Sequence, residues 1–145
     1  MGILNEKIEY KTLSTKQKEI YNFQRVSAVF AVYGYSVTPL HDDDKFADFV
    51  AVPFSENKKT ESLWVQLKGG LTFWKEYSGK NLYICFPDDK NHTWYLYPHD
   101  KLCKKFESKL QTTEKWEKEG IYETAAPSAL PNWAKDSLDE YKIDP

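Results

Sequence analysis

The segment Leu63-Trp64-Val65-Gln66-Leu67-Lys68-Gly69-Gly70 decides the fold predicted for this chain. Hydrophobic residues at positions 63, 65 and 67 alternate with an aromatic and two polar residues at positions 64, 66 and 68. Successive side chains of a strand point to opposite faces. We therefore expect positions 63, 65 and 67 to face a core. The opposite face then carries the amide of Gln66 and the ammonium of Lys68 side by side, where the strand runs into two glycines.

A second alternating run, Ala47-Asp48-Phe49-Val50-Ala51-Val52, precedes this segment and predicts a neighbouring strand. The link between them, residues 53–62, has the composition of a hairpin loop. If the two strands pair antiparallel, the start of one lies beside the end of the other. Asp48 should then lie close to Gln66 and Lys68, so the strand pair predicts a candidate site.

A helix is predicted from Lys16 to Tyr33. Ser14 is suited to the N-cap and Gln17 stands at the reciprocal position of a capping box. Hydrophobic residues then recur at approximately helical spacing, and Gly34 is suited to end the helix. This helix carries two polar side chains of interest, Glu19 and Gln24.

The remaining segments complete a predicted α/β or α+β domain. Branched and aromatic runs predict strands, the hydrophobic spacing of a later segment predicts a second helix, and a proline opens a short last helix. These segments are 35–40, 81–86 and 93–97 for the strands, 100–110 for the helix, and Pro131 for the last helix. We expect one central mixed sheet of four to five strands flanked by helices. The 145 residues fit a single domain, 1–145, with a core over 14–110 and a helical or irregular extension over 111–145.

Composition narrows the classes of function. The net charge of −2 means that contact with nucleic acid must come from local clusters of lysine, such as Lys58-Lys59, and not from a global field. Cys85 and Cys103 lack the spacing of zinc ligands. No apolar run approaches the roughly 20 residues of a membrane span, and the N-terminus lacks a signal peptide. We expect a cytoplasmic location and no membrane partner.

The predicted site has the residue types that phosphodiester hydrolysis needs. A divalent metal polarises the phosphate and lowers the pKa of a water molecule, and Mg²⁺ prefers oxygen ligands. Asp48 offers a carboxylate, and the side-chain oxygen of Gln66 and the backbone carbonyl of Leu67 offer neutral oxygens. Lys68 could orient the attacking water and offset charge on the phosphate.

This arrangement resembles the PD-(D/E)xK nuclease superfamily, which includes restriction endonucleases and archaeal Holliday-junction resolvases. The resemblance lies in Ala47-Asp48, in the 18-residue separation of Asp48 from Gln66, and in Gln66-Leu67-Lys68. The order of predicted elements is also similar to the restriction-endonuclease-like core. The resemblance covers residues 14–110.

The resemblance implies a Mg²⁺- or Mn²⁺-dependent DNA endonuclease with Asp48 and Gln66 as metal ligands and Lys68 as catalytic lysine. The family often adds an acid from the first helix. Glu19 is the acid present there, although Gln24 stands closer to the expected position. Two departures matter, because alanine replaces the proline of the motif and Gln66 replaces its second acid, which removes a negative charge from the metal site. Family members with glutamine at this place are active.

Partners follow from the same prediction. The loop from Gly69 to Lys80 carries Trp74 and Tyr77, which could stack on bases, with Lys75 and Lys80 beside them. DNA is the expected substrate, with RNA as a variant. Cutting both strands of a duplex needs two sites, which favours a homodimer or a higher homo-oligomer.

Other interpretations stay open. The same fold could bind nucleic acid with weak or no catalysis, or its aromatic surface could recognise another protein. Gln66 and Lys68 could simply be a solvated strand end. The acid run Asp42-Asp43-Asp44 is most simply a solvated loop, although such runs can hold divalent cations, and His99 most simply makes a structural hydrogen bond.

Overall fold

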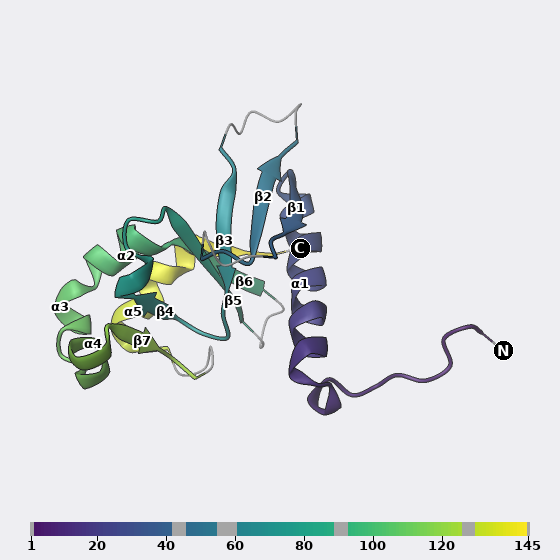
Figure 1. Cartoon of the computed structure of the whole chain (residues 1–145), viewed down its shortest axis with the longest axis horizontal. Helices are drawn as coiled ribbons and strands as arrows, with labels where there is room; N and C mark the ends of the chain where they lie inside the picture. Colours follow the sequence, from purple (N-terminus) through teal and green to yellow (C-terminus); the bar gives the residue numbers. More distant parts are fainter. Residues whose placement is uncertain (1, 42–45, 55–60, 89–92, 126–129, 145) are drawn as a thin grey trace.

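The computed structural model describes residues 2–41, 46–54, 61–88, 93–125 and 130–144. The predicted lysine pair Lys58-Lys59 and acid run Asp42-Asp43-Asp44 lie outside these residues. Figure 1 shows one long helix on one side of a sheet and several short helices on the other. The helical elements are η1 (Tyr10–Thr12), α1 (Thr15–Val32), η2 (Lys75–Tyr77), α2 (His99–Lys105), α3 (Glu107–Leu110), α4 (Glu114–Glu119), α5 (Asn132–Leu138) and η4 (Asp139–Tyr141).

The strands of the described residues form two sheets. Their bounds are β1 (Tyr35–Pro39), β2 (Phe49–Pro53), β3 (Leu63–Leu67), β4 (Thr72–Trp74), β5 (Leu82–Asp88), β6 (Thr93–Pro98), β7 (Ile121–Glu123) and β8 (Lys142–Ile143). The main sheet has the order β1-β2-β3-β5-β6-β8, in which β3 and β5 are parallel and the other neighbours antiparallel. The prediction of a mixed sheet is confirmed, but the sheet has six strands and not four to five. The additional strand is β8, and β4 pairs with β7 in a separate small sheet.

Helix α1 forms where the sequence predicts it. The side chain of Ser14 accepts a hydrogen bond from the backbone N–H of Gln17, and the side chain of Gln17 accepts one from the backbone N–H of Ser14. This reciprocal pair satisfies two donors that a helix start leaves without partners. Gly34 adopts a φ of 89°, a left-handed conformation that favours glycine, and the chain turns there into β1.

Hydrophobic residues pack against both faces of the main sheet. On one face, α1 contributes Val26 and Phe30, which pack with Phe49, Val65 and Cys85. The other face packs against α2, α3 and α5 through a larger cluster with many aromatic residues. Leu63 and Leu67 pack against the same cluster as Val65, so the predicted hydrophobic face of this strand is confirmed.

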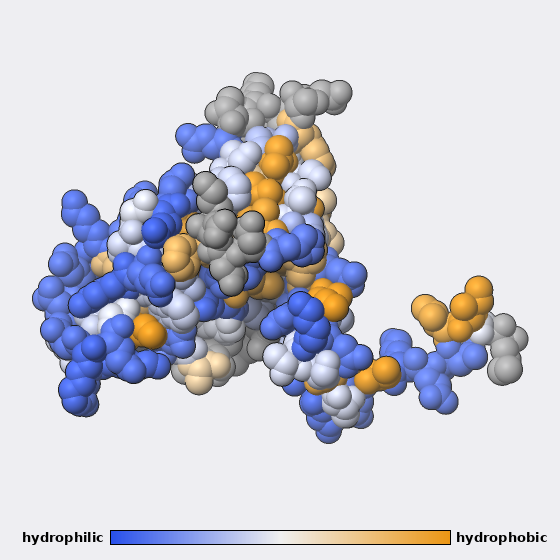
Figure 2. Space-filling model, viewed as in Figure 1, coloured by the Kyte–Doolittle hydropathy of each residue, from blue (hydrophilic) through white to orange (hydrophobic). Residues whose placement is uncertain are grey.

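The C-terminal part differs most from the prediction. The expected helix over 100–110 is interrupted at Phe106 and forms α2 and α3 instead. Pro131 is the N-cap of α5, so the last helix is confirmed. Figure 2 shows a largely hydrophilic surface, with hydrophobic side chains exposed on the N-terminal tail at Ile3 and Leu4. No helix in the described ranges is long and apolar enough to cross a membrane.

Candidate functional site

The antiparallel pairing of β2 with β3 places Asp48 at the end of β3. The backbone N–H of Asp48 donates to the carbonyl of Val65 over 2.8 Å, and the N–H of Leu67 donates to Oδ2 of Asp48 over 2.7 Å. The second bond ends on a carboxylate, and such charge-assisted bonds are stronger than neutral ones. Asp48 is therefore fixed beside the Gln66–Lys68 segment, as the spacing of the two strands predicts.

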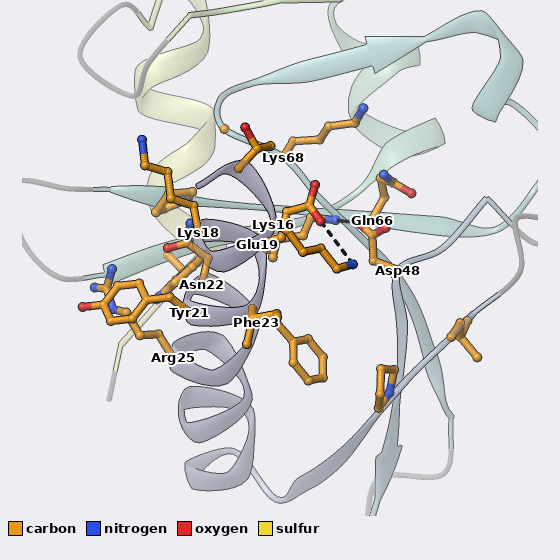
Figure 3. Close-up of a pocket in the computed structure, with 18 of the residues that line it drawn as sticks. Lys16, Lys18, Glu19, Tyr21, Asn22, Phe23, Arg25, Asp48, Gln66 and Lys68 are labelled. Carbon is orange, nitrogen blue, oxygen red and sulfur yellow. Dashed lines mark hydrogen bonds and ion pairs between the residues drawn. The ribbon is translucent and has the colours of Figure 1, made fainter. Parts of the chain in front are cut away.

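A cleft of about 1040 Å³ opens between the first half of α1 and the ends of β2 and β3. Glu19, Asp48, Gln66, Leu67 and Lys68 all line it. Figure 3 shows Glu19 and Phe23 on the side of α1 that faces the ends of β2 and β3, where Asp48, Gln66 and Lys68 lie. Lys18, Tyr21 and Arg25 point to the other side of the helix. The five residues that the sequence singles out for catalysis and metal binding therefore line one cleft.

The two candidates on α1 differ in position. Glu19 lines the cleft, and its carboxylate lies 3.5 Å from the ammonium of Lys16, with both side chains largely exposed. Gln24 is exposed and does not belong to the cleft lining found among the described residues. The geometry therefore favours Glu19 over Gln24 as the polar group that α1 offers to the site.

The side chain of Lys68 is 19% exposed and turns toward the small sheet. Its Nζ lies 4.0 Å from the centroid of the Trp74 ring and 4.0 Å from Oε1 of Glu123. Burial lowers the pKa of Lys68 below its usual range, and the negative charges of Glu123 and Asp48 partly oppose this effect. Lys68 therefore gives up its proton more readily than an exposed lysine does.

Glu123 is the residue of this region that the sequence did not predict. It lies on β7, which pairs with β4, and its Oε1 also accepts a 2.8 Å hydrogen bond from the indole N–H of Trp74. Its carboxylate thus contacts both Lys68 and the ring beneath it. No local pattern marks this role, because β7 has only three residues and lies far from Lys68 in sequence.

The residues predicted to contact nucleic acid include a buried aromatic ring and two exposed lysines. Tyr77 is only 3% exposed and stacks on Trp74, with ring centroids 4.9 Å apart and planes at 12°. A buried ring has no free face on which a base could stack. Tyr77 therefore packs in the core and is not a nucleic-acid contact. Lys75 and Lys80 are exposed, but neither lines the cleft among the described residues.

His99 is fully buried and structural. Its Nε2 accepts a 3.1 Å hydrogen bond from the backbone N–H of Trp74, which leaves the proton on Nδ1, 2.9 Å from Oδ1 of Asp100. Burial lowers the pKa of His99, and Asp100 opposes that shift. His99 therefore fixes the backbone that carries Trp74, the ring against which Lys68 packs.

The cleft lining offers oxygen donors of the kind that hard divalent cations prefer. No group of three histidine, cysteine, aspartate or glutamate side chains gathers around one point in the described part of the chain. The cleft instead combines the carboxylate of Asp48 with the neutral oxygens of Gln66 and Leu67. An all-oxygen set with few charges suits Mg²⁺ or Mn²⁺, because Mg²⁺ is usually held by one or two carboxylates and keeps several waters.

Comparison with known proteins gives no assignment: no family model, curated protein or solved structure matches this chain.

Proposed function

We propose that this protein hydrolyses phosphodiester bonds of DNA in a metal-dependent reaction of the PD-(D/E)xK type. The observation that supports the proposal is the shared cleft. Its five candidate residues come from α1, the start of β2 and the end of β3, which are distant in sequence. If Gln66 and Lys68 were only a solvated strand end, nothing would require Glu19 of α1 to line the same cleft.

Three groups of the chain would hold the metal: the Asp48 carboxylate, the Gln66 side-chain oxygen and the Leu67 carbonyl. When bound, Mg²⁺ would supply Lewis acidity toward the phosphate and lower the pKa of a coordinated water. The hydrogen bond from the Leu67 N–H keeps the Asp48 carboxylate at the end of β3. Glu19 lines the same cleft from α1, where its carboxylate would serve as a proton acceptor.

Lys68 would orient or activate the attacking water. A lysine with a lowered pKa has a larger neutral fraction, which makes it a better proton acceptor near neutral pH. In its charged form the same ammonium offsets the charge that develops on the phosphate. Packing against Trp74 restricts the side chain, so little ordering is needed when substrate binds.

Cleavage of both strands of a duplex requires two such sites. We therefore propose a homodimer or higher homo-oligomer for double-strand cleavage, with each copy cutting one strand.

The test is cleavage of plasmid, linear, branched and single-stranded DNA with Mg²⁺ or Mn²⁺. Lys68→Ala should lower the rate by at least about 10²-fold, because a positioned acid–base group contributes that much. Lys135→Ala, an exposed lysine on α5, is the matched control and should cut normally. Circular dichroism should show that both variants stay folded. Wild-type protein that cuts none of these substrates contradicts the proposal.

A second candidate is a nucleic-acid-binding module of the same fold with weak or no catalysis. The replacement of an acid by Gln66 favours it, because the site then has less charge for a metal. Binding that weakens with salt, without cleavage under any metal condition, would distinguish this module from a nuclease.

A further inference from the structure

The described lining of the cleft is basic although the chain is acidic. Among the described residues that line it, four are cationic and two are acidic. They are Lys16, Lys18, Arg25 and Lys68 against Glu19 and Asp48. The chain as a whole has a net charge of −2. Positive charge is thus concentrated where an anionic backbone could enter.

The α1 side of the cleft also carries an exposed pair of aromatic rings. Tyr10 of η1 and Tyr21 of α1 lie with ring centroids 5.3 Å apart, and they are 46% and 44% exposed. The side-chain amide of Asn22 donates a 2.9 Å hydrogen bond to the hydroxyl of Tyr10, which fixes η1 against the helix. The two rings therefore form an aromatic surface on the edge of the cleft lining, where Tyr21 lies on the side of α1 turned away from Asp48 and Gln66 (Figure 3). We call Tyr10 and Tyr21 the tyrosine pair.

Two cations lie against this pair. The Nζ of Lys18 is 5.4 Å from the centroid of the Tyr10 ring, and the guanidinium of Arg25 is 5.5 Å from that of Tyr21. The ion pairs of the described residues do not include either cation. The charged ends of both side chains thus lie beside the rings, where they can also bind phosphate.

We propose that the tyrosine pair, Lys18 and Arg25 form a binding surface for single-stranded nucleic acid that leads into the cleft. Unpaired bases expose their faces and can stack on aromatic side chains, whereas a duplex keeps its base faces inside. Phosphates on either side of a stacked base would contact Lys18 and Arg25. A protein partner would not require a cation beside each aromatic ring, whereas a nucleic acid presents bases and phosphates in alternation.

This inference deepens the proposed function, because it names the substrate class of the same site, but the binding step itself needs no metal. It also moves the predicted nucleic-acid contacts from Trp74 and Tyr77, which are not among the described residues that line the cleft, to residues of η1 and α1 that do line it. Single-stranded DNA and RNA share the required chemistry, and the test includes both.

The experiment is fluorescence anisotropy in EDTA with labelled single-stranded DNA, single-stranded RNA and a blunt duplex of the same sequence. Wild-type protein should bind at least one single strand about tenfold more tightly than the duplex. Tyr21→Ala should weaken single-strand binding by about tenfold and leave duplex binding unchanged. Phe54→Ala removes a ring of matched exposure, 48%, outside the cleft and is the control.

A second variant keeps the inference testable if Tyr21→Ala does not fold. Lys18→Ala keeps both rings and should reduce the salt dependence of single-strand binding by about 0.7 in log–log slope. Equal affinity for duplex and single strands, binding to none of the three probes, or an unchanged affinity in both variants would overturn the inference. The nuclease proposal is tested separately: single-strand binding in EDTA, without cleavage by the wild-type protein in Mg²⁺ or Mn²⁺, contradicts the nuclease alone.

Discussion

At the scale of single residues, the environment of Lys68 decides what the site can do. Burial alone would favour its neutral form, while the carboxylates of Glu123 and Asp48 favour its charged form. The sequence predicts Asp48, Gln66 and Lys68, because a two-residue strand period and one hairpin bring them together. It does not predict Glu123, because that contact depends on how the small sheet packs, which no local period encodes.

Glu123→Gln tests the electrostatic part of this description. Glutamine keeps an oxygen that can accept from the Trp74 indole, but it removes the negative charge 4.0 Å from Nζ of Lys68. That charge raises the pKa of Lys68, so its loss should lower the pKa further. The limb of the pH–rate profile that Lys68 governs should therefore move to lower pH, whether the neutral or the charged lysine is the active form.

The measurement is the cleavage rate as a function of pH, together with an NMR titration of the Lys68 side chain. Glu76→Gln is the control, because this exposed glutamate is not among the groups that shift Lys68. A limb that stays in place or moves to higher pH in Glu123→Gln would show that Glu123 does not influence the lysine.

At the scale of elements, the accuracy of the sequence prediction follows element length. Helix α1 and strand β3 are long enough to show their period, and both were predicted with nearly their observed bounds. Strands β7 and β8 have three and two residues, which is too short for any period to appear. The break between α2 and α3 at Phe106 also lacks a glycine or proline signal, and Phe106 itself is buried in the core.

The capping box of α1 gives a prediction at this scale. Ser14→Ala removes the side-chain acceptor for the N–H of Gln17 and should lower the free energy of unfolding by about 1 kcal/mol. Denaturant unfolding measures it, with Ser62→Ala, an exposed serine just before β3, as the control. If both variants unfold at the same denaturant concentration, the capping box does not stabilise the helix that carries Glu19.

At the scale of the whole molecule, two sheets must be held together for Lys68 to meet Trp74 and Glu123. Tyr97 of β6 makes this connection: its buried hydroxyl donates to the carbonyl of Thr72 over 2.7 Å and accepts from the N–H of Thr72 over 2.9 Å. The sequence predicts that Tyr97 lies in a strand. It could not predict this bond, because the partner belongs to a second sheet that the sequence pattern does not show.

Tyr97→Phe should therefore destabilise the protein. The change leaves the buried N–H and carbonyl of Thr72 without their partner, which costs about 1–3 kcal/mol for a buried polar group. The free energy of unfolding and the hydrogen exchange of the Thr72 amide measure the effect. Tyr122→Phe, on the same small sheet, removes a hydroxyl that makes no such bond in the described part of the chain and should be nearly neutral. Equal stability of the two variants would contradict the proposed connection between the sheets.

The central claim is that Asp48, Gln66 and Leu67 hold a divalent metal at the end of β3. The most direct measurement is anomalous diffraction from crystals grown with saturating Mn²⁺, for the wild type and for Asp48→Asn. We predict a peak at metal–oxygen distance, roughly 2.1 Å, from the Asp48 carboxylate and from an oxygen of Gln66 or Leu67. The peak should weaken or disappear in Asp48→Asn. Wild-type crystals with no manganese at Asp48 would contradict the claim.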